Sequence, residues 1–164
     1  MKIFVVDGYN VIHSIPAFER ALNQSLRHAR ETLIQICFQY ANTRGDIRRI
    51  YLVFDGKDEF ADLPTDSREK LTVIFSNTKE EADGRIIDML QNRNSPDDWW
   101  VVSRDNEIMN NAKSMRAKSI SPLDFLEGMS AKKTAAKTPA TPHKSLSDST
   151  AQKITDEYRR HLGI

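Results

Sequence analysis

Three short apolar runs, each followed closely by an aspartate, constrain the fold of this chain most strongly. The runs and their acids are Ile3–Val6 with Asp7, Ile50–Phe54 with Asp55, and Trp99–Val102 with Asp105. An unbroken run of β-branched and aromatic residues is typical of a strand that is covered on both faces, as in a parallel sheet. Ligands of open α/β sheets bind at the carboxyl ends of such strands. The acids are therefore expected at the binding edge, although Asp7 alone is equally well explained as a helix or turn cap.

The segments between these runs have the spacing of helices. Apolar residues recur every three or four positions from Leu22 to Tyr40, Pro16 is placed to begin that helix, and Gly45 is placed to stop it. Further helices are expected after Asp105 and over Leu123–Met129. The remaining expected elements are a third strand at Lys70–Phe75, a short fifth strand at Lys118–Ile120, and a short helix capped by Asp66 or Ser67.

This alternation predicts an α/β domain with a mainly parallel central sheet of about five strands. The domain is expected to span residues 1–129. Residues 130–148 are rich in lysine and contain two prolines but little apolar bulk, which predicts a basic disordered linker. Residues 149–164 predict a short amphipathic helix that either packs on the domain or docks a partner.

Charge, cysteine content and hydropathy limit the class of protein that the chain can be. The 164 residues carry a formal net charge of +1, which neither requires nor excludes a nucleic-acid partner. The single cysteine, Cys37, lies in an apolar helical pattern and cannot form an internal disulfide. No run is long enough to span a membrane, and the first strand lacks a signal-peptide cleavage pattern. A cytoplasmic setting is the expectation.

A fourth candidate acid lies at the start of a helix. Thr78 and Glu81 have the spacing of a capping box, which predicts a helix start, and Asp83 follows in the first turn and a half. Acids at this position also complement the helix dipole, and this explanation is stronger for Glu80 and Glu81 than for Asp83. With connections of the usual handedness, Asp83 would open onto the same edge as the other aspartates.

Four carboxylates at one edge raise one another's pKa unless a cation neutralises them. Mg²⁺ and Mn²⁺ suit an oxygen-only set, whereas Zn²⁺ would favour histidine and cysteine. Such ions support phosphodiester hydrolysis by activating water and stabilising the charge that develops on the phosphate. The four histidines are scattered, and no phosphate-binding loop or dinucleotide fingerprint is present. His13 lies close enough to the edge to touch substrate, but an ordinary surface or turn histidine is the favoured interpretation.

The ordered motifs resemble a known family. Val6–Ile12, which contains Asp-Gly-Tyr-Asn, is similar to the opening of the NYN domains of the PIN-like nuclease superfamily, especially the YacP-like subgroup. Val53–Gly56, Thr78–Asp83 and Val102–Asp105 resemble the later motifs in the right order. The resemblance covers about residues 1–127. It implies a Rossmann-like three-layer fold and a metal-dependent endoribonuclease that acts on RNA, mRNA in particular, with the ribosome as a candidate partner.

The resemblance also implies roles for individual residues. Its catalytic candidates are Asp7, Asp55, Asp83 and Asp105, with Asp7, Asp83, Asp105 and Glu81 as candidate metal ligands and Asn10, Ser103 and Arg104 as candidate substrate-binding residues. Glu81 is either a ligand or only the capping-box partner. Asn10 would orient Asp7 or contact phosphate, and Ser103 would orient Asp105 or hold a phosphate. Where many relatives have a second acid soon after the last aspartate, this chain has Asn106 and then Glu107, so the number of metal ions stays open.

The main alternative is a PIN-like scaffold module that binds RNA without cleaving it. Arg44, Arg48, Arg49 and the basic linker would then hold phosphates by charge, with affinity that falls as salt rises. A phosphatase or receiver-like domain fits less well, because the first strand does not end in an Asp-x-Asp pair.

Overall fold

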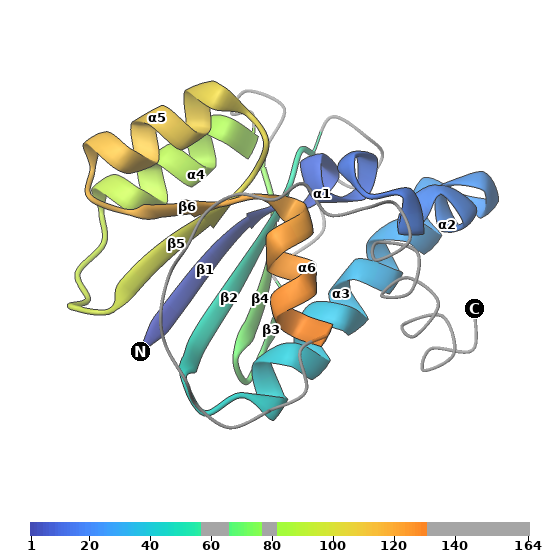
Figure 1. The fold of residues 1–164 in the computed structure, drawn as a ribbon, viewed down its shortest axis with the longest axis horizontal. Helices are drawn as coiled ribbons and strands as arrows, with labels where there is room; N and C mark the ends of the chain where they lie inside the picture. Colours follow the sequence, from blue (N-terminus) through green and yellow to red (C-terminus); the bar gives the residue numbers. More distant parts are fainter. Residues whose placement is uncertain (57–65, 77–81, 131–164) are drawn as a thin grey trace, which may run out of the picture. The chain divides into compact units, whose positions relative to one another are not determined.

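The fold is built on one six-stranded sheet, seen in a computed structural model that describes residues 1–56, 66–76 and 82–130 (Figure 1). Its strands are β1 (Lys2–Asp7), β2 (Ile47–Phe54), β3 (Asp66–Arg68), β4 (Leu71–Phe75), β5 (Asp98–Val102) and β6 (Lys118–Ile120). They are arranged in the order β3-β4-β2-β1-β5-β6. Five strands are parallel, and β3 pairs antiparallel with β4 at one edge. The predicted mainly parallel sheet is confirmed.

The strands pair in a register that places their carboxyl ends together. Val6 of β1 pairs with Val102 of β5, and Asp7 pairs with Val53 of β2. On the other side of β2, Phe54 pairs with Phe75 of β4. The residues that follow these strands therefore emerge side by side along one edge of the sheet.

Helices cover both faces of the sheet. They are α1 (Gly8–Ser14), the 3₁₀ helix η1 (Pro16–Phe18), α2 (Glu19–Gln24), α3 (Leu26–Thr43), α4 (Ala82–Gln91), α5 (Asn106–Ser114) and α6 (Pro122–Ser130). Figure 1 shows α4 and α5 together on one face and α3 on the other. None of the helices in the described part of the chain is both long enough and apolar enough to cross a membrane.

The alternation of side chains along β1 separates the two halves of the core. Ile3 and Val5 join the cluster under α4 and α5, which includes Ile86 and Ile108. Phe4 points to the opposite face, where its ring lies 5.1 Å from Phe125 and 6.5 Å from Tyr40 of α3, measured between centroids. Because successive strand residues face opposite sides, β1 is buried on both faces, and the structure has the three layers that were predicted.

The long helix predicted from Pro16 to Tyr40 is wrong in detail. The structure divides it into η1, α2 and α3, because Ser25 adopts an extended backbone (φ −172°, ψ 157°). The Ser25 side chain accepts a hydrogen bond from the backbone N–H of His28 and so caps α3. The helix also ends at Thr43, before Gly45. The apolar periodicity continues across Ser25, so the sequence pattern does not reveal that this residue caps a new helix.

Two further differences lie near the carboxyl edge. The helix expected after Asp66 or Ser67 is instead the edge strand β3. The short helix α1, which starts directly after Asp7, was not predicted. The Thr78–Glu81 capping box, the linker at 131–148 and the helix at 149–164 lie outside the described residues.

Gly8 allows this abrupt change from strand to helix. A Cβ atom at Gly8 would lie 2.3 Å from Cε1 of Phe54, whose ring is fully buried between Tyr9 and Phe75. That ring cannot move aside without disturbing its neighbours. Any side chain at position 8 would therefore separate α1 from β2.

We expect Gly8→Ala to lower the free energy of unfolding by about 2 kcal/mol, as overpacking of a filled core does. Gly45→Ala is the matched control, because a Cβ atom there meets no atom within 4 Å. Urea unfolding measures both. In a Gly8→Ala/Phe54→Leu double variant, the smaller side chain should relieve the clash, so the combined loss should be less than the sum of the single losses. Strict additivity would contradict this explanation.

Candidate functional site

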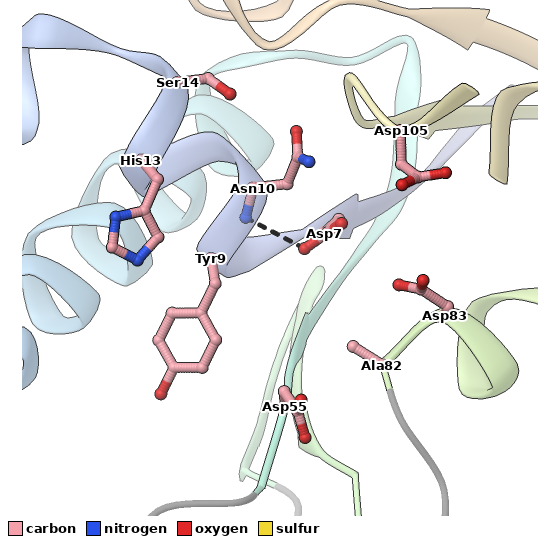
Figure 2. A pocket seen from close by; sticks show the side chains of 9 residues that line it. All are labelled: Asp7, Tyr9, Asn10, His13, Ser14, Asp55, Ala82, Asp83 and Asp105. Carbon is pink, nitrogen blue, oxygen red and sulfur yellow. Dashed lines mark hydrogen bonds between the residues drawn. The ribbon is translucent and has the colours of Figure 1, made fainter. Parts of the chain in front are cut away.

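Four aspartates line one pocket at the carboxyl edge of the sheet (Figure 2). Asp7 ends β1, Asp55 follows β2, Asp83 lies in the first turn of α4, and Asp105 caps α5. The pocket has a volume of about 390 Å³ and is completed by Tyr9, Asn10, His13, Ser14 and Ala82. The four acids selected from separate parts of the sequence are thus neighbours in space.

Asp7 is the most buried of these carboxylates, with 7% of its surface exposed. Its Oδ1 accepts a hydrogen bond from the backbone N–H of Asn10 (3.1 Å), which caps α1. Its Oδ2 accepts one from the hydroxyl of Ser103 (3.3 Å). Burial, with smaller contributions from the charges of Asp83 and Asp105, raises the pKa of Asp7 to about 6. Asp7 is therefore both a cap and a pocket residue.

Ser103 connects two of the acids. Its side chain is fully buried, and its Oγ donates to Asp7 and accepts from the backbone N–H of Asp105 (3.0 Å). The carboxylate of Asp105 then caps α5 by accepting from the N–H groups of Glu107 (2.7 Å) and Ile108 (3.1 Å). The pairing of Val6 with Val102 explains this arrangement, because Asp7 and Ser103 are the next residues along each strand.

Asn10 also links the ends of β1 and β5. Its side-chain Oδ1 accepts a hydrogen bond from the backbone N–H of Arg104 (2.7 Å), while its own N–H donates to Asp7. The segment after β1 is thus bonded to the segment after β5 through two separate side chains, Asn10 and Ser103. Arg104 is exposed beside the pocket, although its side chain is not part of the lining.

Asp55 has a serine beside it in the same way. Ser76, which follows β4, is 2% exposed, and its Oγ accepts from the N–H of Gly56 (3.2 Å) and makes a long contact of 3.5 Å with Asp55 Oδ1. The pairing of Phe54 with Phe75 places these two residues together. An aspartate and a buried serine therefore meet at two neighbouring pairs of strand ends.

The sequence matches the YacP-like NYN domain family over residues 4–163. The chain belongs to this family. It is also 33% identical over 95 residues to the uncharacterized protein YacP of Bacillus subtilis strain 168; the match covers 58% of this chain and 55%, about half, of that protein.

The fold of this YacP-like NYN protein is similar to two crystal structures of Rae1 (YacP) from B. subtilis. One matches with a TM-score of 0.62 over 99% of this chain and 82% of the other. The second, of a mutant with a tryptophan replaced by leucine, matches with a TM-score of 0.60 over 98% of this chain and 82% of the other. Sequence identity is 22% in both. These matches confirm the expected PIN-like fold.

The donors in the pocket fit a hard cation such as Mg²⁺ or Mn²⁺, because they are carboxylate oxygens without cysteine. Within residues 1–56, 66–76 and 82–130, however, no three histidine, cysteine or acidic side chains lie close enough together to hold one ion. Mg²⁺ commonly binds through one or two carboxylates and keeps several waters. The donor chemistry therefore fits a largely hydrated ion. Glu81, the other candidate ligand, lies outside the described residues.

The pocket also contains residues that sequence reasoning passed over. His13 was considered as a substrate contact but interpreted as an ordinary surface or turn histidine, and Tyr9 and Ser14 were given no role, yet all three line the pocket. Tyr9 and His13 are four residues apart on α1, so they share one helix face. The shared helix face could have been recognised only if α1 had been predicted, and its seven residues are too few to show a clear apolar period.

We expect Asp7→Asn to stabilise the protein at neutral pH. A carboxyl group whose pKa is higher in the folded than in the unfolded state costs stability once it ionises. For Asp7 this cost is absent below pH 4, grows as the pH rises towards 6, and reaches about 3 kcal/mol above that. The asparagine oxygen keeps the α1 cap. Urea unfolding should therefore show equal stabilities at pH 4 and a clear advantage for the variant at pH 8.

Asp98→Asn is the control, since Asp98 is an exposed residue at the amino end of β5. It should show no advantage that grows with pH. If the pocket takes Mg²⁺, the ion should raise the melting temperature of wild type more than that of Asp7→Asn. A pH-independent difference between Asp7→Asn and wild type would contradict the buried-carboxylate explanation.

Proposed function

We propose that this protein is a metal-dependent endoribonuclease. The observation that carries the proposal is the meeting of Asp7, Asp55, Asp83 and Asp105 in one pocket, with the pKa of Asp7 raised mainly by burial and further by Asp83 and Asp105. Such a cluster favours a cation, and the YacP-like NYN family has a PIN-like fold, which is usually that of a nuclease.

In this proposal Asp7, Asp83 and Asp105 would hold one or two largely hydrated Mg²⁺ or Mn²⁺ ions between them, with Glu81 as a further candidate ligand. A bound ion would supply an activated water and would neutralise charge that develops on the scissile phosphate. Ser103 holds Asp7 and the Asp105 backbone in position, and the hydrogen bond from the Arg104 backbone to Asn10 fixes the loop on which Arg104 lies. Arg104 is exposed next to the pocket, where its guanidinium can contact a phosphate. The proposed substrate is RNA, mRNA in particular, with the ribosome as a candidate partner.

The alternative is RNA binding without cleavage. It is favoured by the absence of a three-ligand metal group in the described residues and by Glu107, which is not part of the pocket lining. The arginines on which it relied are less available than the sequence suggested. Arg44 pairs with Asp46 (2.8 Å), Arg48 pairs with Asp97 (3.2 Å), and Arg49 donates to Thr72 (2.9 Å).

A cleavage assay on single-stranded and structured RNA tests the two proposals. With Mg²⁺ or Mn²⁺, wild type should make internal cuts that a chelator abolishes. Asp7→Asn and Asp83→Asn should each reduce the rate by at least roughly a hundredfold, since even second-shell changes cost about tenfold to a hundredfold. Asp98→Asn, at the opposite end of the sheet, should cleave like wild type.

Each outcome separates the two functions. Cleavage that survives in both pocket variants would contradict the nuclease proposal. Binding of RNA without cleavage, weakened by salt and unchanged or strengthened in the pocket variants, would support the scaffold.

Ser103 should affect cleavage through the acids that it positions. Ser103→Ala leaves the Asp105 N–H without this acceptor and frees Asp7 Oδ2, so we expect about a tenfold slower reaction and a higher Mn²⁺ concentration for half-maximal rate. Metal titrations of the cleavage rate measure both effects. Ser114→Ala is the matched control, because Ser114 donates a local hydrogen bond to the backbone carbonyl of Asn111 at the end of α5. An unchanged metal requirement in Ser103→Ala would show that Ser103 has no positioning role.

A further inference from the structure

The pocket has an aromatic side as well as an acidic one. Figure 2 shows Tyr9 and His13, both from α1, on the side away from Asp83 and Asp105, with Asp7 between the two groups. The ring centroids of Tyr9 and His13 are 6.4 Å apart. The role proposed above for the acids gives no function to this aromatic side.

The Tyr9 ring is held by a closed set of contacts. It packs against Phe54 at 5.2 Å, and Phe54 packs against Phe75 at 5.6 Å, both between centroids. The guanidinium of Arg30, from α3, lies 5.9 Å from the centre of the Phe75 ring and donates a hydrogen bond to the Tyr9 hydroxyl (2.9 Å). These contacts fix the ring at both ends, from its backbone on α1 to its hydroxyl.

Arg30 is a buried charged residue that holds the Tyr9 ring in place. The residue is only 4% exposed, and a charge with so little access to water must be compensated by the groups around it. The Tyr9 hydroxyl and the Phe75 ring supply part of that compensation. Because the phenol is positioned before any ligand arrives, a ligand that packs on it loses little further conformational entropy in the protein.

The charge of the pocket selects the kind of group that can pack there. The four carboxylates repel a phosphate unless a cation lies between them, but they do not repel an uncharged aromatic ring. Nucleobases are such rings, and stacking on tyrosine is a common way for proteins to hold an unpaired base. The pocket volume of about 390 Å³ lies in the range of small-ligand sites.

We propose that Tyr9, positioned by Arg30, is a stacking platform for one unpaired base of the RNA strand whose phosphate reaches the aspartates. This inference rests on the proposed function for its substrate class. It assigns the base contact to the α1 side of the pocket and the phosphate contact to the acidic side. The site would then select single-stranded over paired RNA, since the faces of a base within a duplex are already stacked on its neighbours.

A binding experiment tests the platform without relying on cleavage. The full chain carrying Asp83→Asn, in which cleavage should be at least roughly a hundredfold slower, is titrated in Mg²⁺ against a fluorescent adenosine hexaribonucleotide and against an abasic strand of the same length. The protein with Tyr9 should bind the hexanucleotide about tenfold more tightly than the abasic strand, within the roughly five- to hundredfold range of base stacking. Adding Tyr9→Leu should remove most of that difference and leave binding of the abasic strand unchanged.

Two variants separate stacking from a structural role. Tyr9→Phe loses the bond to Arg30 but keeps the ring, so it should retain most of the preference for the hexanucleotide. Tyr51→Leu removes a half-buried tyrosine that stacks on Trp99 under α4 and α5, and it should not change the preference. Thermal unfolding confirms that each variant is folded.

Equal affinities of the Tyr9 protein for the two strands would overturn the platform, and this comparison needs no variant at position 9. An equal loss on both strands in Tyr9→Leu would also overturn it. Wild-type cleavage is measured separately. A base preference that depends on Tyr9, in a protein that never cleaves, would contradict the nuclease proposal and leave the platform standing. Cleavage by the wild-type protein without this base preference would support the nuclease proposal and overturn the platform.

Discussion

The site depends on one buried carboxylate at the end of the central strand. Asp7 accepts hydrogen bonds from the N–H of Asn10 and from the hydroxyl of Ser103, so one side chain ends β1, starts α1 and contacts the residue after β5. Its position between β2 and β5 buries it, and burial is the main reason for its raised pKa. The fold thus holds in place a carboxylate whose charged form is disfavoured by burial. Carboxylates with pKa values perturbed in this way are concentrated at functional sites.

The parallel register extends this arrangement to the neighbouring strands. Asp7 with Ser103 and Asp55 with Ser76 are two examples of an acid and a buried hydroxyl at adjacent strand ends. In both, the serine also accepts a backbone N–H, so the hydroxyl is fixed in orientation. Strand pairing therefore sets the positions of Asp7 and Asp55 and of the serines beside them.

Much of this arrangement could be predicted from the sequence, because its signals are local and strong. The apolar runs before Asp7, Asp55 and Asp105 identify buried parallel strands, and parallel strands bring their carboxyl ends together. The family resemblance then predicted the PIN-like fold. The roles of the individual aspartates stay predictions, as do the metal ions, the RNA substrate and the Glu81 ligand.

The missed features have physical reasons. Helix α1 is short, and its clearest apolar residues, Val11 and Ile12, are adjacent, which gives no helical period. Ser25 breaks a helix whose apolar face continues on both sides of it, so only the backbone reveals the cap. Asp66 and Ser67 are good caps by composition, but pairing with β4 decided their conformation. The contact of Arg30 with Tyr9 joins residues 21 positions apart, and no spacing pattern in the sequence predicts it.

The strand order has a consequence for how the protein is made. The first strand to be synthesised, β1, lies in the middle of the sheet, and its neighbour β5 comes from residues 98–102. A growing chain that has not yet reached Ser103 and Asp105 leaves Asp7 without its hydroxyl partner and leaves one wall of the pocket missing. Contacts between distant parts of a chain also form late in folding. The pocket can therefore be complete only after the chain has been made beyond Asp105 and β5 has paired with β1.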